Sequence, residues 1–222
     1  NNFAKSDMDA VRKLIKKKDL ILTQSKNVLE FEKKWSKWLG VRYSVFVNSG
    51  SSANLISMLI LKSFSPKKRE IILPTLTWVS DINSVLIAGF KPVFVDIEPR
   101  TLSMNQDQIL KKINKNTLAV FVTHVQGFNS LSDKVLKKIK RRKILLIEDV
   151  CESHGATFKG KKLGTFGQIS NFSFYYAHHM STIEGGMICT NDKQIYEKAR
   201  IFRSHGMARE SKNTKFQKKI IK

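Results

Sequence analysis

The run from Ser173 to Met187 carries the densest group of reactive side chains in the chain, with His178 and His179 adjacent between an aromatic segment and a glycine-rich one. Such a pair could ligate a metal, but neighbouring side chains diverge and no cysteine or carboxylate cluster completes a ligand set. An imidazole, with a reference pKa of about 6.5, can take or give a proton near neutral pH. We therefore expect general acid–base chemistry from one of these histidines and no metal site.

A second motif, the turn of residues 48–54, joins an apolar run to a helical pattern. Gly50 lets another group approach the backbone closely, and the hydroxyls of Ser51 and Ser52 lie beside the first amides of the helix. The positive end of a helix is a natural anion site, so the turn could bind phosphate. An ordinary helix cap has the same composition, and both interpretations stay open at this point.

Two further positions could contact a planar, charged ligand. Trp78 lies between an apolar run and a helical pattern, where an indole can stack on a flat ring, although core packing would equally explain it. Glu148 and Asp149 end the most apolar run of the chain. A carboxylate there is costly unless a cation or a hydrogen-bond donor meets it, and a protonated pyridine nitrogen is one such partner.

These motifs follow short apolar runs that alternate with amphipathic segments. The pattern predicts buried strands at 43–47, 70–73, 92–95, 118–122 and 144–147, and helices at 52–63, 79–88, 106–115 and 131–142. Such alternation is typical of an α/β fold with a mainly parallel sheet and helices on both faces. Ligands of these sheets bind at the carboxyl ends of the strands, which is where the polar motifs lie.

The composition of the chain limits the classes of protein to which it could belong. The chain has 222 residues, 40 Lys and Arg, 18 Asp and Glu, a net charge of +22 and two cysteines. The charge could indicate a nucleic-acid-binding protein, but the basic residues are scattered at the ends of predicted elements, so we treat this as a distant alternative. No apolar stretch approaches the length of about 18 residues that a membrane span needs, and the first residues lack a signal pattern. We expect a cytoplasmic protein with no membrane contact.

The motifs together resemble those of the DegT-type nucleotide-sugar aminotransferase family. The similarity covers nearly the whole chain and depends on the order of five motifs: Asn48-Ser-Gly-Ser-Ser-Ala53, Pro74-Thr-Leu-Thr-Trp78, Glu148-Asp149 with its continuation to Ala156, Gly164-Thr-Phe-Gly167, and Ser173-Phe-Tyr-Tyr-Ala-His178 with Glu184-Gly-Gly. It implies the large domain of aspartate-aminotransferase-like (fold type I) enzymes over residues 41–222. Residues 1–40 are predicted as N-terminal helices that pack on it. The small C-terminal domain of the family is not expected within this chain.

The resemblance also implies a cofactor, pyridoxal 5'-phosphate or pyridoxamine 5'-phosphate, in a homodimer with a shared active site. Trp78 would stack on the cofactor ring, and Asp149 would pair with the ring nitrogen. The phosphate would be held by a serine- and glycine-rich group: Gly50, Ser51, Ser52 and Ser173.

Two departures from the aminotransferase pattern select the reaction. His178 stands where the aminotransferases carry the lysine that bonds to the cofactor aldehyde, and an imidazole cannot form that bond. Glu152 stands where they usually carry glutamine. Both residues resemble the branch of the family that removes the C3 hydroxyl of a sugar. A related branch with an iron–sulfur cluster needs cysteines, and residues 190–222 contain none.

The implied activity is a C3 dehydration of a nucleotide-linked 4-keto-6-deoxy sugar with L-glutamate as amine donor, in deoxysugar and O-antigen polysaccharide biosynthesis. His178 would be the base, Asp149 would keep the ring nitrogen protonated, and Glu152 would lie near the cofactor. His124 and His154 are expected to line the pocket. The alternatives are a nucleotide-sugar 4-aminotransferase and, more distantly, a non-catalytic or nucleic-acid-binding basic protein.

Overall fold

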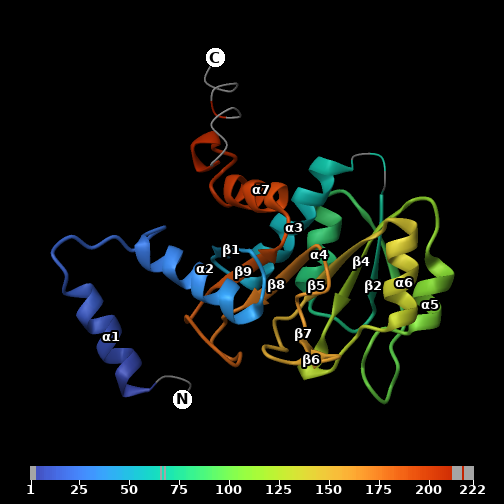
Figure 1. Ribbon diagram of the computed structural model, residues 1–222, viewed down its shortest axis with the longest axis horizontal. Coiled ribbons are helices and arrows are strands. Elements are labelled where there is room, and N and C mark those ends of the chain that lie inside the picture. Colours follow the sequence, from blue (N-terminus) through green and yellow to red (C-terminus); the bar gives the residue numbers. More distant parts are fainter. Residues whose placement is uncertain (1–3, 66, 68, 212–216, 218–222) are drawn as a thin grey trace.

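A seven-stranded sheet forms the centre of the computed structural model, which describes residues 4–65, 67, 69–211 and 217 (Figure 1). The strand order is β1-β9-β8-β5-β4-β2-β3. The strands are β1 (Tyr43–Val47), β2 (Glu70–Pro74), β3 (Lys91–Val95), β4 (Thr117–Thr123), β5 (Leu145–Asp149), β8 (Ile169–Ser173) and β9 (Gly186–Thr190). A separate hairpin pairs β6 (Thr157–Phe158) with β7 (Lys161–Lys162).

Helices cover both faces of this sheet. The covering helices are α2 (Lys26–Leu39), α3 (Gly50–Phe64), α4 (Val79–Ile87), α5 (Gln106–Lys112), α6 (Asp133–Arg142) and α7 (Lys193–Arg203). A further helix, α1 (Lys5–Ile15), does not cover the sheet, and short 3-10 turns lie at Val125–Gly127 and Ala208–Glu210. Buried residues of α2, α5 and α6 form one apolar cluster with the sheet, and those of α3, α4 and α7 form the other. Both faces are therefore buried, which explains why the predicted strands are continuous apolar runs.

All strands of the seven-stranded sheet except β9 run in the same direction. β9 is antiparallel to both of its neighbours, whereas β2–β3, β2–β4, β4–β5 and β5–β8 are parallel pairs. The carboxyl ends of β1, β2, β4, β5 and β8 consequently meet along one edge. The predicted mainly parallel α/β fold is confirmed.

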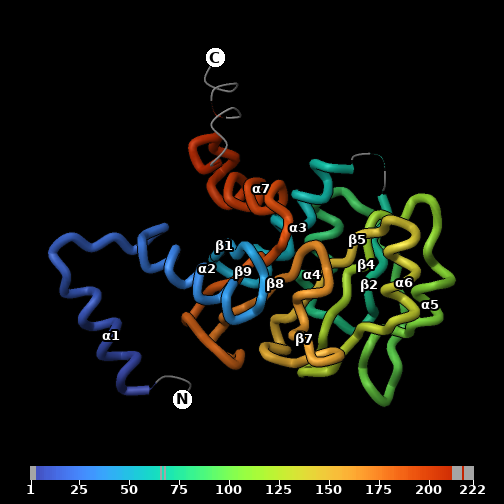
Figure 2. Tube along the Cα trace, in the orientation of Figure 1, coloured from blue at the N-terminus to red at the C-terminus, as the bar shows by residue number. Residues whose placement is uncertain are grey.

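The N-terminal helices differ in how they contact the sheet. α2 buries Trp35 and Leu39 against it and ends at Gly40, whose φ of +92° suits a residue without a side chain. α1 buries no residue, and it lies away from the sheet in Figures 1 and 2. The division of the chain at residue 40 stays a prediction.

Local polar bonds set element boundaries that periodicity alone misplaces. α3 begins at Gly50, two residues before the predicted start, because Ser49 caps it by accepting a bond from the Ser52 amide at 3.0 Å. α5 ends at Lys112 rather than 115, because Asn114 turns the chain and its amide donates to Thr117 Oγ1 at 3.0 Å. Within the described residues, no helix combines the length and apolarity that crossing a bilayer requires.

Candidate active site

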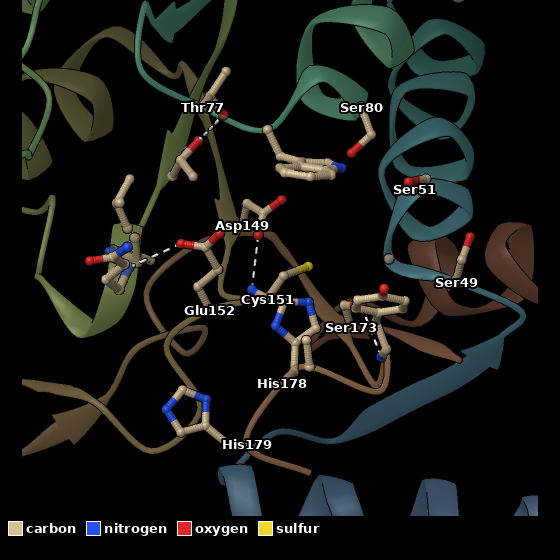
Figure 3. A pocket seen from close by; sticks show the side chains of 18 of the residues that line it. Ser49, Ser51, Thr77, Ser80, Asp149, Cys151, Glu152, Ser173, His178 and His179 are labelled. Carbon is tan, nitrogen blue, oxygen red and sulfur yellow. Dashed lines mark hydrogen bonds between the residues drawn. The ribbon is translucent and has the colours of Figure 1, made fainter. Parts of the chain in front are cut away.

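A cavity of about 970 Å³ opens at the carboxyl ends of the parallel strands. Its walls come from the segments that follow β1, β2, β4, β5 and β8, so residues far apart in the sequence face one space (Figure 3). Its lining residues include most of those predicted for the site: Gly50, Ser51, Trp78, His124, Asp149, Glu152, Ser173 and His178.

One end of the cavity is the start of α3. Ser49 and Ser51 lie there, at the positive end of the helix (Figure 3). A Cβ added to Gly50 would lie 2.7 Å from the Cβ of Ser173 and 3.0 Å from Cys151 Sγ, so only glycine lets β8 come this close. The helix amides, Ser51 and Ser173 thus form a compact polar corner that suits a phosphate.

Ser52 differs from the other predicted phosphate-binding residues because it does not line the cavity. Its amide donates to Ser49 Oγ, and its own hydroxyl accepts a bond from Ser49 at 3.1 Å. Ser52 therefore completes the cap of α3, and its predicted contact with phosphate has no support in this geometry.

Trp78 lies at the cavity wall with 65% of its surface exposed. A tryptophan that packed the core would be buried, so the core interpretation of this residue is wrong. The exposed indole is instead available for a planar ligand.

The two carboxylates at the end of β5 have different surroundings. Glu148 is fully buried and accepts hydrogen bonds from the amides of Gly164, Phe166 and Gly167 at 2.7–2.9 Å. His124 Nε2 lies 3.2 Å from it and donates, because His124 Nδ1 accepts a bond from the Ser130 amide. Glu148 thereby holds the 164–167 loop, a role that its sequence position alone did not reveal.

Asp149 points to the opposite side and reaches the cavity. One carboxylate oxygen accepts a bond from the Cys151 amide at 2.9 Å, and the other accepts one from Asn54 Nδ2 at 3.1 Å. These bonds fix the orientation of the carboxylate at the cavity, where a cationic ligand group could meet it.

Glu152 and His178 face the same space as Asp149 (Figure 3). Glu152 is oriented by the Gln126 amide, which donates to it at 3.2 Å. Burial lowers the pKa of the half-buried His178 imidazole, against the opposing influence of Glu152 and Asp149. A histidine with a lowered pKa is neutral at pH 7, and a neutral imidazole can accept a proton.

The positions of the other histidines agree only in part with the prediction of which ones line the cavity. His124 lines the cavity as expected, and His179 lines it too. His154, also expected at the pocket, instead packs among Trp35, Phe172 and Phe174 with ring centroids 5.5–5.7 Å away. Burial in this aromatic cluster lowers the pKa of His154 to about 4.

Several other residues line the cavity although they were not predicted as site residues. They are Ser49, Leu76, Thr77, Ser80, Thr123, Val125, Gln126, Cys151, Tyr175, Ala177 and Glu184. Most of them adjoin a predicted motif, so their position after a strand end was an available signal. Among the described residues, no lysine lines the cavity.

Comparisons with known proteins identify the family to which a chain with this fold belongs. The model of the DegT/DnrJ/EryC1/StrS aminotransferase family matches residues 1–221. The chain therefore belongs to this family of pyridoxal-phosphate-dependent enzymes.

Individual relatives include both dehydratases and aminotransferases. The chain is 37% identical over 194 residues to GDP-4-keto-6-deoxy-D-mannose 3-dehydratase of Escherichia coli O55:H7, which covers 85% of this chain and 50% of the relative. It is also 37% identical over 180 residues to GDP-perosamine synthase of Caulobacter vibrioides, covering 81% and 48%. The chain thus spans about half the length of these curated relatives.

The similar solved structures likewise include a dehydratase and an aminotransferase. The E. coli 3-dehydratase with bound hydrated pyridoxal phosphate superimposes with a TM-score of 0.89 at 33% identity, over 94% of this chain and 54% of that one. Helicobacter pylori PseC, an aminotransferase of pseudaminic acid biosynthesis, gives 0.86 at 32% identity over 92% and 54%. The predicted type I large-domain fold is confirmed.

Proposed function

We propose that this protein is a pyridoxal-phosphate-dependent 3-dehydratase that removes the C3 hydroxyl of a nucleotide-linked 4-keto-6-deoxy sugar, with L-glutamate as amine donor. The observation that carries the proposal is the cavity itself, which presents the imidazole of His178 beside Asp149 and Glu152, while no lysine among the described residues lines it. An imidazole can move protons but cannot bond covalently to the cofactor aldehyde. The 3-dehydratase relatives support the same activity.

The residues present fit the cofactor. Gly50 leaves no room for a side chain, which keeps the amides of α3, Ser51 and Ser173 close enough to hold a phosphate together. Trp78 would lie against the ring, and the oriented Asp149 carboxylate would pair with the ring nitrogen. When bound, the cofactor supplies an amine for the sugar ketone and a ring that accepts electrons.

The chain contributes proton transfer and orientation. His178 is neutral near pH 7, so one ring nitrogen can accept a proton as the reaction begins. Returning that proton to the departing C3 oxygen would let the hydroxyl leave as water. Glu152, held by the Gln126 amide, faces His178 and would favour the protonated imidazole between these two transfers.

A second candidate is a nucleotide-sugar 4-aminotransferase, which the 37% identity to a GDP-perosamine synthase favours. The two activities differ in their products. A dehydratase releases ammonia and a 4-keto-3,6-dideoxy sugar, whereas an aminotransferase retains the nitrogen as a C4-amino sugar with its C3 hydroxyl intact. The homodimer with a shared site, the cytoplasmic location and the O-antigen pathway remain predictions.

The test is product analysis by mass spectrometry with glutamate and GDP- or CDP-linked 4-keto-6-deoxy sugars. We expect the wild type to give the dideoxy sugar, and His178→Asn to bind pyridoxal phosphate but form none, because an amide cannot accept the proton. His178→Lys should instead become covalently modified by the cofactor, as shown by borohydride treatment and mass spectrometry. His205→Asn, at an exposed histidine outside the cavity, is the matched control. A C4-amino sugar from the wild type would replace the dehydratase with the aminotransferase.

A further inference from the structure

A second buried carboxyl group lies behind Asp149. Asp81, in the first turn of α4, is completely buried, and Asp149 is 4% exposed. Asn54 Nδ2 joins them, because it donates to Asp81 Oδ1 at 2.6 Å and to Asp149 Oδ2 at 3.1 Å. Neither the sequence motifs nor the proposed reaction uses Asp81.

The hydrogen bonds around Asp81 need one proton more than its neighbours supply. Asp81 Oδ2 is hydrogen-bonded to Thr77 Oγ1 and, at 2.8 Å, to Thr123 Oγ1. The two hydroxyl oxygens are themselves only 2.6 Å apart. Three contacts among three oxygens require three protons, and two hydroxyls provide two. A proton on the Asp81 carboxyl completes the set.

The amide that joins the carboxyl groups has a fixed orientation. Asn54 Oδ1 accepts a bond from Asn171 Nδ2 at 2.8 Å, and Asn171 Oδ1 accepts one from Ser57 at 2.8 Å. This chain from α3 and β8 directs Asn54 Nδ2, a pure donor, toward both carboxyl groups. Asn54 can satisfy an oxygen of each group, but it brings no charge to neutralise either.

The surroundings contain no compensating cation. None of the ion pairs of the described residues involves Asp81 or Asp149. Two adjacent buried carboxylates cannot both be ionised at modest cost, so the pair retains a proton. Burial, and then the nearby Asp149, raises the pKa of Asp81 well above its ordinary value. Burial likewise raises the pKa of the neighbouring Cys151 thiol.

The two carboxyl groups differ in where they face. Asp149 reaches the cavity, toward Glu152 and His178, whereas Asp81 is enclosed by Thr77 and Thr123. The enclosed group is the one whose hydrogen bonds require a proton. The cavity group accepts hydrogen bonds from the Cys151 amide and from Asn54, and neither bond requires a proton on Asp149.

We propose that Asp81 is a positioning residue that holds the single proton of the Asp81–Asp149 pair and so keeps the negative charge of the pair on Asp149, at the cavity. The cationic partner of that charge, the ring nitrogen of pyridoxal phosphate, is taken from the proposed function. The location of the proton depends only on the residues of this chain.

The first test needs no cofactor. In protein labelled with 13C at the aspartate carboxyl carbon, one resonance should have the chemical shift of a protonated carboxyl at pH 7. It should vanish in Asp81→Asn and persist in Asp149→Asn, so the assignment stands even if one variant does not fold. The absence of any protonated aspartate in the wild type, or the loss of this resonance in an Asp149→Asn variant that is folded, would overturn the proposal. Asp133→Asn, at an exposed aspartate of α6, controls for general effects.

The second test uses pyridoxal phosphate as the probe, in an absorbance titration. Asp81→Asn replaces a neutral acid with a neutral amide, so the dissociation constant should stay within about threefold, whereas Asp149→Asn should weaken binding at least about tenfold by removing a charge. Equal weakening by both variants would mean that Asp81 also carries charge, which would overturn the proposal. If the wild type binds no pyridoxal phosphate, the proposed function fails while the carboxyl resonances still decide where the proton lies.

Discussion

Glu148 and Asp149 are adjacent in sequence and almost equally buried, yet their carboxylates lie on opposite sides of β5 and have different surroundings. Glu148 is surrounded by three backbone amides and His124, so all of its partners belong to the protein. Asp149 has one amide and one side-chain donor, and it faces a cavity. Because neighbouring residues of a strand point to opposite faces, a single peptide bond separates a structural carboxylate from one that is available to a ligand.

The comparison teaches that burial alone does not identify a functional carboxylate. Both groups bear the cost of leaving water, and what differs is whether protein donors offset it. All the donors to Glu148 are groups of the protein, so this carboxylate needs no ligand. On the other side of β5, the titratable groups that interact with Asp149 include Asp81, Cys151, His154 and His178, none of which is a lysine or an arginine. A cationic ligand would complete that side.

The largest expected effect is on stability. Glu148→Gln replaces one acceptor oxygen with an amide group that cannot accept from the 164–167 loop, and leaving buried amides unpaired should lower the free energy of unfolding by about 3 kcal/mol. Urea denaturation measures this change. Glu30→Gln, at an exposed glutamate of α2, is the control and should leave the midpoint unchanged. A Glu148→Gln midpoint equal to that of the wild type would show that the loop does not depend on this carboxylate.

The next effect is on turnover. Asp149→Asn cannot hold a ring-nitrogen proton by charge, so formation of the dideoxy sugar should fall at least about a hundredfold, equivalent to about 2.7 kcal/mol of transition-state stabilisation. The free energy of unfolding should change by less than about 1 kcal/mol, because the amide keeps an oxygen that can accept a hydrogen bond and removes a buried charge that no ion pair of the described residues offsets. Rates near those of the wild type would make Asp149 an ordinary strand-end carboxylate.

The smallest effect concerns the pKa of His178. Because burial lowers this pKa, the neutral base should be present above the folded-state pKa and lost only as the pH falls through a value below 6.5. Asp149 opposes the lowering, so Asp149→Asn should move the His178 pKa further down. Glu148→Gln should leave it unchanged, since Glu148 is not among the groups that influence His178. An NMR titration of the imidazole measures the pKa of His178 in the wild type, in Asp149→Asn and in Glu148→Gln. A wild-type pKa above 6.5 would contradict the expectation.

Much of the fold was predictable because it depends on local patterns. The apolar runs at 43–47 and 118–122 became β1 and β4, and the predicted helices cover both faces of the sheet as expected. Polar turns just after strands identified Gly50 and Asp149 as cavity residues. Element boundaries were less accurate, since they depend on individual caps such as Ser49.

The sequence by itself determined which chemical groups follow each strand, among them the glycine and serines of residues 49–51, Trp78 and the histidine in place of lysine. That Trp78 is exposed at the cavity, and not packed in the core, was decided by the structure. The tertiary structure alone decided which carboxylate is enclosed and which is open, because the donors to Glu148 lie 16–24 residues away in the chain. It also placed His154 in the aromatic cluster of α2 and β8, and it brought Asn54 to Asp149 across 95 residues. Periodicity records which face of an element is apolar, but hydrogen-bond partners across a sheet depend on strand order and register, which no local pattern specifies.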